Sequence, residues 1–320
     1  MTGSTGNVII GLSAVVMGVR GGEIATLTVR SDGPRALPAG PFDPDADRTF
    51  ELALRAFVTQ QTGFELGYVE QLYTFGDKGR DAPLADLGGE AGPGAARVVS
   101  VGYLALTPTA GEAPAIAADW APWSRFFPYE DWRRGRPAML DEAIAPALIA
   151  WADGNPERQA RVRLLFALDG ARWNEERVLD RYELLYEAGL APEAERDRAR
   201  VRGESGEALV SMLGEPMASD HRRILATALG RLRGKLKYRP VVFELMSPTF
   251  TLSALQKTVE SVSGVPLHKQ NFRRMIVRTG LVEGLGRLEP DTGGRPAELF
   301  RFRREGLVST SAPGLSLPLA

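Results

Sequence analysis

Two spacings of apolar residues follow one another early in the chain, and their order restricts the possible folds more than any other feature. β-Branched runs at 8–19 and 23–30 flank Arg20-Gly21-Gly22, a pattern typical of a β-hairpin. From Asp47 to Gln61 the apolar residues recur every three or four positions, which predicts an amphipathic helix. Strand segments followed by an amphipathic helix predict a domain in which a sheet packs against a helix.

Signals at the ends of these segments complete the first domain. Asp43-Pro44-Asp45 is a helix-start signal, and Gly63 is a natural helix stop. Two further strands are expected at 66–75 and 96–107. The order strand–strand–helix–strand–strand predicts an α+β domain, which we place at residues 1–118.

The next region, 119–216, is expected to be helical. All five tryptophans lie between Trp120 and Trp173. The region opens with an aromatic cluster that comprises Trp120, Trp123, Phe126, Phe127, Tyr129 and Trp132. We expect this cluster to pack between helices and the β-domain, with a ligand pocket or a dimer surface as the alternative.

A long amphipathic helix is predicted from about 217 to 237, within a linker segment 217–240. Its apolar stripe comprises Ile224, Leu225, Ala228, Leu229, Leu232 and Leu236. Six basic residues occupy its other faces, namely Arg222, Arg223, Arg231, Arg233, Lys235 and Lys237.

The segment 241–306 has the pattern of a winged helix-turn-helix. Thr251 is a good N-cap for a helix that Gly264 ends. A second helix is expected at about 267–279, followed by a candidate hairpin with arms at about 281–289 and 297–303. Leu267, Phe272 and Ile276 can face the core of this unit.

The tail, 307–320, is rich in Ser, Pro and Leu and is expected to be disordered.

The net charge is the sum of two opposite parts. The chain has 39 Lys/Arg and 40 Asp/Glu residues, a net charge of −1. Residues 221–304 hold 17 basic and 6 acidic residues, a local charge of +11, so the remainder carries −12. A basic module attached to an acidic body indicates binding to a polyanion.

The second helix of the basic module is the expected reader of double-stranded DNA. Arg and Lys suit guanine edges and phosphates, whereas Gln and Asn suit adenine edges. The candidate DNA-binding residues are Lys257, His268, Lys269, Gln270, Asn271, Arg273, Arg274, Arg278 and, at the hairpin tip, Arg295. The alternatives are a solvated helix face, an RNA-binding module or a winged helix that contacts only protein.

The composition excludes several kinds of site. There is no cysteine, so disulfides and Cys-ligated zinc or iron–sulfur sites are excluded. The two histidines, His221 and His268, are too few for a His-rich metal centre or a conventional Ser-His-Asp triad. We expect no metal and no cofactor. His221 is interpreted as a structural contact at a helix start, and His268 as a first-turn polar contact or a phosphate donor.

Neither a membrane span nor a secretory signal is apparent, so a cytoplasmic protein is expected.

The stretch from Phe243 to Glu283, together with TGGRPAELFRF, resembles the C-terminal winged helix of the Nudix-related transcriptional regulators, a family that includes repressors of NAD biosynthesis. SDHRRILATALGRLRGKLKY resembles the linker helix of the family. LPAG at 37–40, the helix that ends QQTG and the strand ARVVSVGYLAL resemble its Nudix-like domain. The region 120–210 is longer than in the NAD regulators, which points to a distinct branch.

The resemblance implies a Nudix-like α/β/α sandwich, a helical middle region and a C-terminal winged helix. It also implies a homodimer, a DNA operator and an effector related to ADP-ribose or to another nucleotide-like or sugar metabolite. Lys78, Arg80, Arg97 and the LPAG loop are candidates for anion contacts by position, with ordinary surface residues as the alternative. By resemblance alone, a repressor is favoured over an activator.

The Nudix helix departs from the pattern of active enzymes. Anchoring the box on Gly63 places Gln60 and Gln61 at its two adjacent Glu positions and Phe57 at the preceding Glu. Ala56 takes the Arg position and Arg48 the first Glu. Those glutamates bind Mg²⁺ in active enzymes, and Gln lacks the anionic charge that this requires. The sequence therefore predicts no metal-dependent hydrolase activity.

Two other functions are left open. One is a divergent nucleotide pyrophosphatase with an accessory nucleic-acid-binding domain. The other is a scaffold whose Trp-rich centre binds a protein partner.

Overall fold

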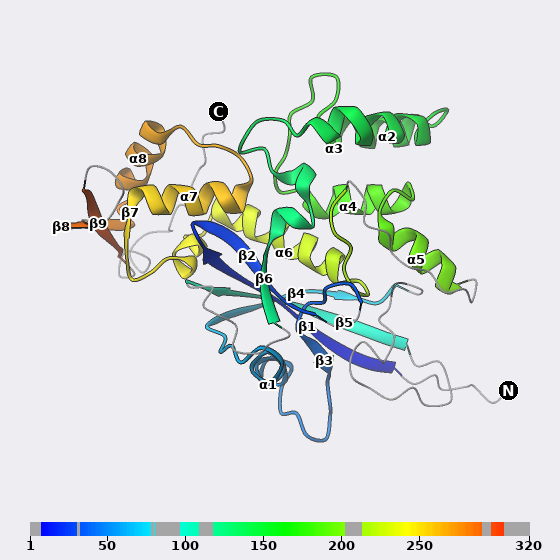
Figure 1. Ribbon diagram of the computed structural model, residues 1–320, viewed down its shortest axis with the longest axis horizontal. Coiled ribbons are helices and arrows are strands. Elements are labelled where there is room, and N and C mark those ends of the chain that lie inside the picture. The colour runs from blue at the N-terminus through cyan, green and yellow to red at the C-terminus, as the bar shows by residue number, and fades with distance from the viewer. Residues whose placement is uncertain are drawn as a thin grey trace.

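A computed structural model describes residues 8–30, 33–77, 80, 97–108, 118–201, 213–289 and 296–303 (Figure 1). Lys78, Arg295 and the predicted disordered tail 307–320 lie outside the described residues. The mixed α+β class and the C-terminal winged helix are confirmed, with a mixed sheet, a helical middle region and a separate three-stranded sheet near the C-terminus.

The predicted hairpin is present. Strands β1 (Val8–Arg20) and β2 (Glu23–Val29) are antiparallel, with Arg20 opposite Glu23. Gly21 and Gly22 form the two-residue turn with φ of 59° and 84°, the left-handed values that favour glycine in such a turn.

The sheet contains two strands more than expected. Its order is β4-β5-β1-β2-β6, and β3 (Ala39–Pro41) pairs with β1. Strands β4 (Tyr68–Phe75) and β5 (Arg97–Thr107) were anticipated, and β5 runs parallel to β1. Strand β6 (Ala118–Pro122) pairs with β2 and carries Trp120. Trp120, the first residue of the aromatic cluster, thus belongs to the sheet, because β2 leaves an edge that this segment covers.

Helix α1 (Phe50–Thr62) begins three residues later than expected. Thr49 is its N-cap, and the Thr49 hydroxyl accepts a hydrogen bond from the backbone N–H of Leu52 at 3.2 Å. The proposed start signal instead closes a turn in which the Asp43 carboxylate accepts from the backbone N–H of Asp45. Gly63 ends the helix in the left-handed conformation, as expected.

The two faces of the sheet are covered by different layers. Leu12, Val16 and Tyr103 lie on the face that packs against α1, in one core with its Leu54 and Val58. Alternate residues of the same strands lie on the opposite face and pack against the helical middle region, among them Val15, Met17, Leu104 and Leu106. Period-two alternation therefore supplies both sides of an α/β/α sandwich.

Short helices make up the middle region. They are η2 (Trp123–Arg125), η3 (Pro128–Glu130), the π-helical turn η4 (Leu140–Ile144), α2 (Ala145–Trp151), α3 (Pro156–Leu165), α4 (Val178–Glu187) and α5 (Pro192–Val201). Trp123, Phe126, Phe127 and Tyr129 are buried in the same core as the sheet residues Val15 and Met17. Packing, the favoured interpretation of the aromatic cluster, is confirmed for these four residues.

The linker helix α6 (His221–Leu236) is more enclosed than an amphipathic pattern indicates. Its apolar stripe is buried as expected. Arg222, Arg233 and Lys235 lie off that stripe, yet they are also buried. Arg222 and Arg233 are covered by the middle region, whereas Lys235 packs against Tyr68 and Glu70 of β4. Each of these cations has an acidic partner, namely Glu193, Glu130 and Glu70 respectively.

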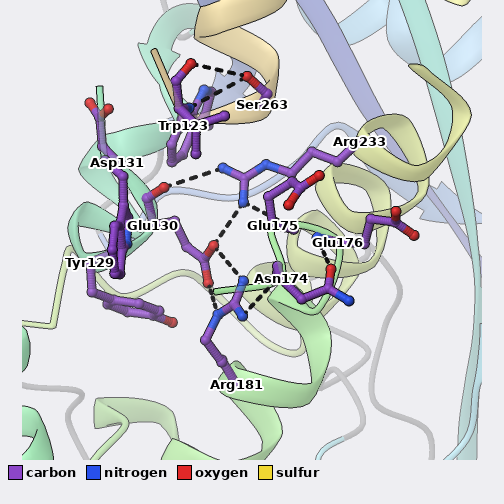
Figure 2. Close-up of polar contacts among 12 residues, drawn as sticks. Trp123, Tyr129, Glu130, Asp131, Asn174, Glu175, Glu176, Arg181, Arg233 and Ser263 are labelled. Carbon is purple, nitrogen blue, oxygen red and sulfur yellow. Dashed lines mark hydrogen bonds and ion pairs between the residues drawn. The ribbon is translucent and has the colours of Figure 1, made fainter. Parts of the chain in front are cut away.

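Glu130 is the centre of a fully buried ionic cluster (Figure 2). Its carboxylate contacts the Nε of Arg181 at 2.5 Å, the Nη2 of Arg181 at 2.8 Å and the Nη1 of Arg233 at 2.7 Å. All three side chains have no exposed surface. The remaining guanidinium N–H groups donate to backbone carbonyls, those of Leu165 and Asn174 from Arg181 and those of Val262 and Glu175 from Arg233.

The winged helix comprises η5 (Val241–Leu245), β7 (Thr249–Thr251), α7 (Leu252–Ser263), α8 (Lys269–Arg278), β8 (Val282–Glu289) and β9 (Ala297–Phe302). The predicted caps of α7 are confirmed, because the Thr251 hydroxyl accepts from the backbone N–H of Ala254 and Gly264 has φ of 74°. Strand β9 pairs with both β7 and β8.

The body of the protein satisfies the last carbonyls of α7, which a free helix leaves without partners. The indole N–H of Trp123 donates to the carbonyl of Ser261 at 2.8 Å. The Nε–H of Arg233 donates to the carbonyl of Val262 at 2.9 Å, and the backbone N–H of Trp132 donates to that of Gly264 at 2.6 Å. A cation at a helix C-terminus also interacts favourably with the helix dipole.

A second ionic cluster fastens the residues after β4 to the start of α6. Arg80 contacts Glu183 of α4 at 2.8 Å and Asp220 at 3.8 Å. Arg223 contacts Asp220 at 3.2 Å. Burial raises the pKa of Asp220 to about 7, although both neighbouring arginines act to lower this pKa.

We predict that Arg233→Ala lowers the free energy of unfolding by about 3–5 kcal/mol, because it leaves Glu130 buried with one partner fewer. Arg231→Ala on the exposed side of the same helix should change that free energy by less than about 0.5 kcal/mol. Urea unfolding of both variants measures the difference. Equal midpoints for the two variants would contradict the assigned role of the Glu130 cluster.

The raised pKa of Asp220 predicts a dependence of stability on pH. Between about pH 4 and pH 7 the folded protein retains a proton that an unfolded Asp has lost. Stability should therefore fall as the pH rises through this window, by at most about 1.4 kcal/mol per pH unit, and level off above it. Asp220→Asn cannot titrate, so its curve should lack this decline. Parallel curves for the two proteins, measured by urea unfolding at several pH values, would refute the assignment.

Candidate nucleic-acid interface and effector face

Helix α8 presents one apolar and one polar side, as predicted. Phe272 and Ile276 are 1% and 0% exposed and anchor the helix in the core, together with Leu267 in the preceding turn. The outward residues are all exposed, namely Lys269, Gln270, Asn271, Arg273, Arg274 and Arg278. The buried side fixes the orientation of α8, so that the hydrogen-bond donors on its other side face solvent.

The turn between α7 and α8 is held by side chains of α7. The Glu260 carboxylate accepts hydrogen bonds from the backbone N–H of Leu267 at 2.8 Å and from the Gln256 amide at 3.0 Å. His268 occupies the N-cap position of α8, but its exposed side chain makes no capping hydrogen bond.

Two of the exposed arginines are oriented by neutral partners. Arg273 Nη2 donates to the Ser253 hydroxyl at 3.2 Å, and Arg274 Nη2 donates to the Asn271 amide oxygen at 2.7 Å. Neither contact neutralises charge, so both guanidinium groups keep the capacity to pair with phosphate or with a base.

The wing adds further charge beside α8. Strands β8 and β9 pair from Val282 opposite Phe302 to Glu289 opposite Ala297, with an irregularity between Gly284 and Leu288. Arg301 pairs with Glu283 at 2.9 Å on this exposed surface. The predicted tip contact, Arg295, lies outside the described residues.

The structure divides the basic charge of residues 221–304 into two groups. On α6, Arg222, Arg223, Arg233, Lys235 and Lys237 have acidic partners. Within the described ranges no ion pair involves the exposed cations around α8, which are Lys257, Lys269, Arg273, Arg274 and Arg278. The sequence could not separate the two groups, because the acidic partners of α6 lie far away along the chain.

The LPAG loop is clamped by the helix that follows it. The Gln61 amide oxygen accepts from the backbone N–H of Ala39 at 3.1 Å, and the Gln61 amide N–H donates to the Ala39 carbonyl at 2.6 Å. The ring of Phe57 covers Gly40 so closely that a Cβ at Gly40 would lie 2.7 Å from it. Gln61 and Phe57, two of the residues that the sequence alignment assigns to Glu positions of the Nudix box, thus contact the loop.

The other residues assigned to the altered Nudix box, Arg48, Ala56 and Gln60, are exposed. Among the residues that the structure describes, there is no group of three or more His, Asp or Glu side chains that could hold a metal ion.

The candidate anion contacts are used within the protein where they are described. Arg80 stacks over the ring of Tyr186 at 3.5 Å besides its pairing with Glu183. Arg97 is exposed and donates to the carbonyl of Gly76.

The expectation that His221 makes a helix-start contact is confirmed, because its Nδ1 accepts from the backbone N–H of Leu37 at 3.0 Å.

Sequence reasoning did not single out Glu130 and Arg181. Each is one charged residue in a helical segment with no motif around it, and only the folded chain brings the two together.

Comparisons with known proteins agree with this domain order. The model of the NrtR DNA-binding winged helix domain matches residues 242–302. The ADPR-responsive transcriptional repressor NtrR of Acinetobacter baylyi is 40% identical over 86 residues, which cover 27% of this chain and 34% of that protein. The chain thus matches about a third of the length of this relative.

Two solved structures share the fold over nearly the whole chain. NrtR of Shewanella oneidensis in complex with a 27mer DNA has a TM-score of 0.55 at 19% identity, with 97% of this chain and 99% of that chain covered. A MutT/nudix family protein from Enterococcus faecalis has a TM-score of 0.51 at 16% identity, with 95% and 89% covered.

Within the described residues, no helix has the length and apolar character needed to cross a membrane. Residues 242–302 thus match a DNA-binding winged helix domain of the NrtR type, and the chain as a whole shares the fold of NrtR.

Proposed function

We propose that this protein is a ligand-responsive transcriptional regulator that binds double-stranded DNA through α8 and the wing. The observation that carries the proposal is the row of exposed cations and amides on α8, a helix anchored by Phe272 and Ile276. The match to a DNA-binding winged helix domain over 242–302 supports it.

The sensing unit of this proposal is the Nudix-like domain. The relative with 40% identity is named for its response to ADPR, so we propose an ADP-ribose-like effector for this chain and, from the same name, action as a repressor. The LPAG loop, held by Gln61 and covered by Phe57, is the element we place at the effector.

We further propose that the sensing domain does not catalyse Mg²⁺-dependent hydrolysis. Gln60 and Gln61 bring no anionic oxygen to the positions where an active Nudix enzyme holds its metal, and Gln61 is engaged with Ala39. The enzyme alternative is therefore less favoured. The scaffold alternative is also weakened, because Trp123 and Tyr129 of the Trp-rich centre are buried.

The proposed working form is a cytoplasmic homodimer. Two half-sites multiply the modest affinity of a single module. Because the end of α7 is bonded to the body of the protein, a change in the sensing domains would alter the relative placement of the two readers. Such a response requires that the effector bind the two arrangements with different affinity.

We predict that Arg273→Ala and Arg274→Ala each weaken binding to a duplex selected from a random library by the wild-type protein. The expected loss is about 1–3 kcal/mol for each variant. Arg163→Ala, which removes an exposed arginine from α3, should leave affinity unchanged. Fluorescence anisotropy at fixed salt measures all three variants. Wild-type affinity in both α8 variants would exclude α8 as the recognition helix.

We predict that ADP-ribose raises the melting temperature of the protein by several degrees at a concentration about 100 times the Kd, since binding only to the folded state adds about 2.7 kcal/mol of stability. The same mixture with Mg²⁺ should yield no AMP, which chromatography would detect. Robust hydrolysis would favour the enzyme. No thermal shift with ADP-ribose would exclude it as the effector.

A further inference from the structure

A cleft lies between the N-terminal sheet domain and the winged helix. Its volume is about 1100 Å³. One wall is the turn of the β1–β2 hairpin, Gly21 and Gly22, and the base is formed by β7 and the first turns of α7. The far wall is the outer end of the described wing, at Glu289 and Glu298. In Figure 1 the blue hairpin ends beside α7, and the wing lies on the other side of β7.

The cleft carries positive charge on its α7 and α8 side. Lys257, Lys269 and Arg273 line it and are exposed, and no described carboxylate forms an ion pair with any of the three. The two glutamates are confined to the wing. Lys269 and Arg273 also belong to the outward row of α8, so the cleft is continuous with the proposed DNA-binding surface.

The hairpin turn is fixed in this position. The backbone N–H of Ile24, at the start of β2, donates to the buried Ser261 hydroxyl of α7 at 2.8 Å. The turn has no side chain of its own, and a Cβ at Gly21 or Gly22 would meet nothing within 4 Å. Its backbone is therefore open to an occupant of the cleft.

We propose that phosphates of one DNA strand run through this cleft, so that the β1–β2 turn of the sensing domain forms part of the DNA interface. The inference rests on the proposed function and extends it, because DNA contact is then not confined to the winged helix. A polyanion suits Lys257, Lys269 and Arg273, which lie on two different helices and form no ion pair with a described carboxylate. A DNA strand also fits a cleft that continues into the surface of α8.

One position of the turn allows a test by charge alone. Gly21 has φ of 59°, a conformation that Asn and Asp tolerate, and both residues are favoured before Gly in a two-residue hairpin turn. Gly21→Asn and Gly21→Asp should therefore both fold, and they differ by one negative charge. Gly170, in the loop between α3 and α4, also has positive φ (79°) and open space around it. Its Asn and Asp variants control for net charge.

With the selected duplex and low salt, Gly21→Asp should bind about 3- to 10-fold more weakly than Gly21→Asn, the size expected for one repulsive charge near phosphates. The gap should narrow as salt rises, and the two Gly170 variants should bind equally. Equal affinity of the two Gly21 variants, for a duplex that the wild type binds, would overturn the inference and leave the proposed function standing.

Two other results also decide the matter. A smaller ADP-ribose thermal shift in Gly21→Asp, with DNA affinity equal to that of Gly21→Asn, would make the cleft a metabolite site and overturn the inference. Failure of the wild type to select any duplex would overturn the proposed function itself.

Discussion

The buried carboxylate of Glu130 is the interaction on which the arrangement of the other parts depends. Three ionised side chains without exposed surface, Glu130, Arg181 and Arg233, carry a desolvation cost that only close pairing and complete hydrogen bonding can offset. That condition fixes α4, α6 and the end of α7 relative to one another, because Arg181 and Arg233 lie on the first two and Arg233 donates to the carbonyl of Val262. The winged helix is thus fastened to the rest of the protein through the carbonyl of Val262, which accepts from an arginine of this cluster.

Buried ion pairs of this kind explain why the charge pattern of the sequence is only partly a binding signal. Arg222, Arg233 and Lys235 contribute to the basic excess of residues 221–304 but serve the interior. The cations of α8, in contrast, are exposed on the surface. In helix α1, Gln61 and Phe57 likewise serve structure, because they clamp and cover the LPAG loop.

Local signals were sufficient for much of the fold. The hairpin at Gly21-Gly22, the helix end at Gly63, the caps Thr251 and Gly264 and the inward residues Phe272 and Ile276 follow from backbone preferences and apolar spacing. The start of α1 was placed too early, because Asp43 can close a turn as readily as it can begin a helix. Strand β6 was missed, because its five residues, Ala118–Pro122, pair with β2 only across the fold.

By itself the sequence determined the order of a sheet domain, a helical region and a winged helix, and it located the exposed polar row on α8. Spacing along one segment is enough for this, because the buried and exposed sides of a helix or strand repeat with its own period. Only the tertiary structure decided which cations have acidic partners among the described residues. It also decided which groups Arg80 and His221 contact, and that the β1–β2 turn borders the winged helix. Those outcomes depend on partners distant in the sequence, such as Glu130 with Arg233, and no local pattern records such a pairing.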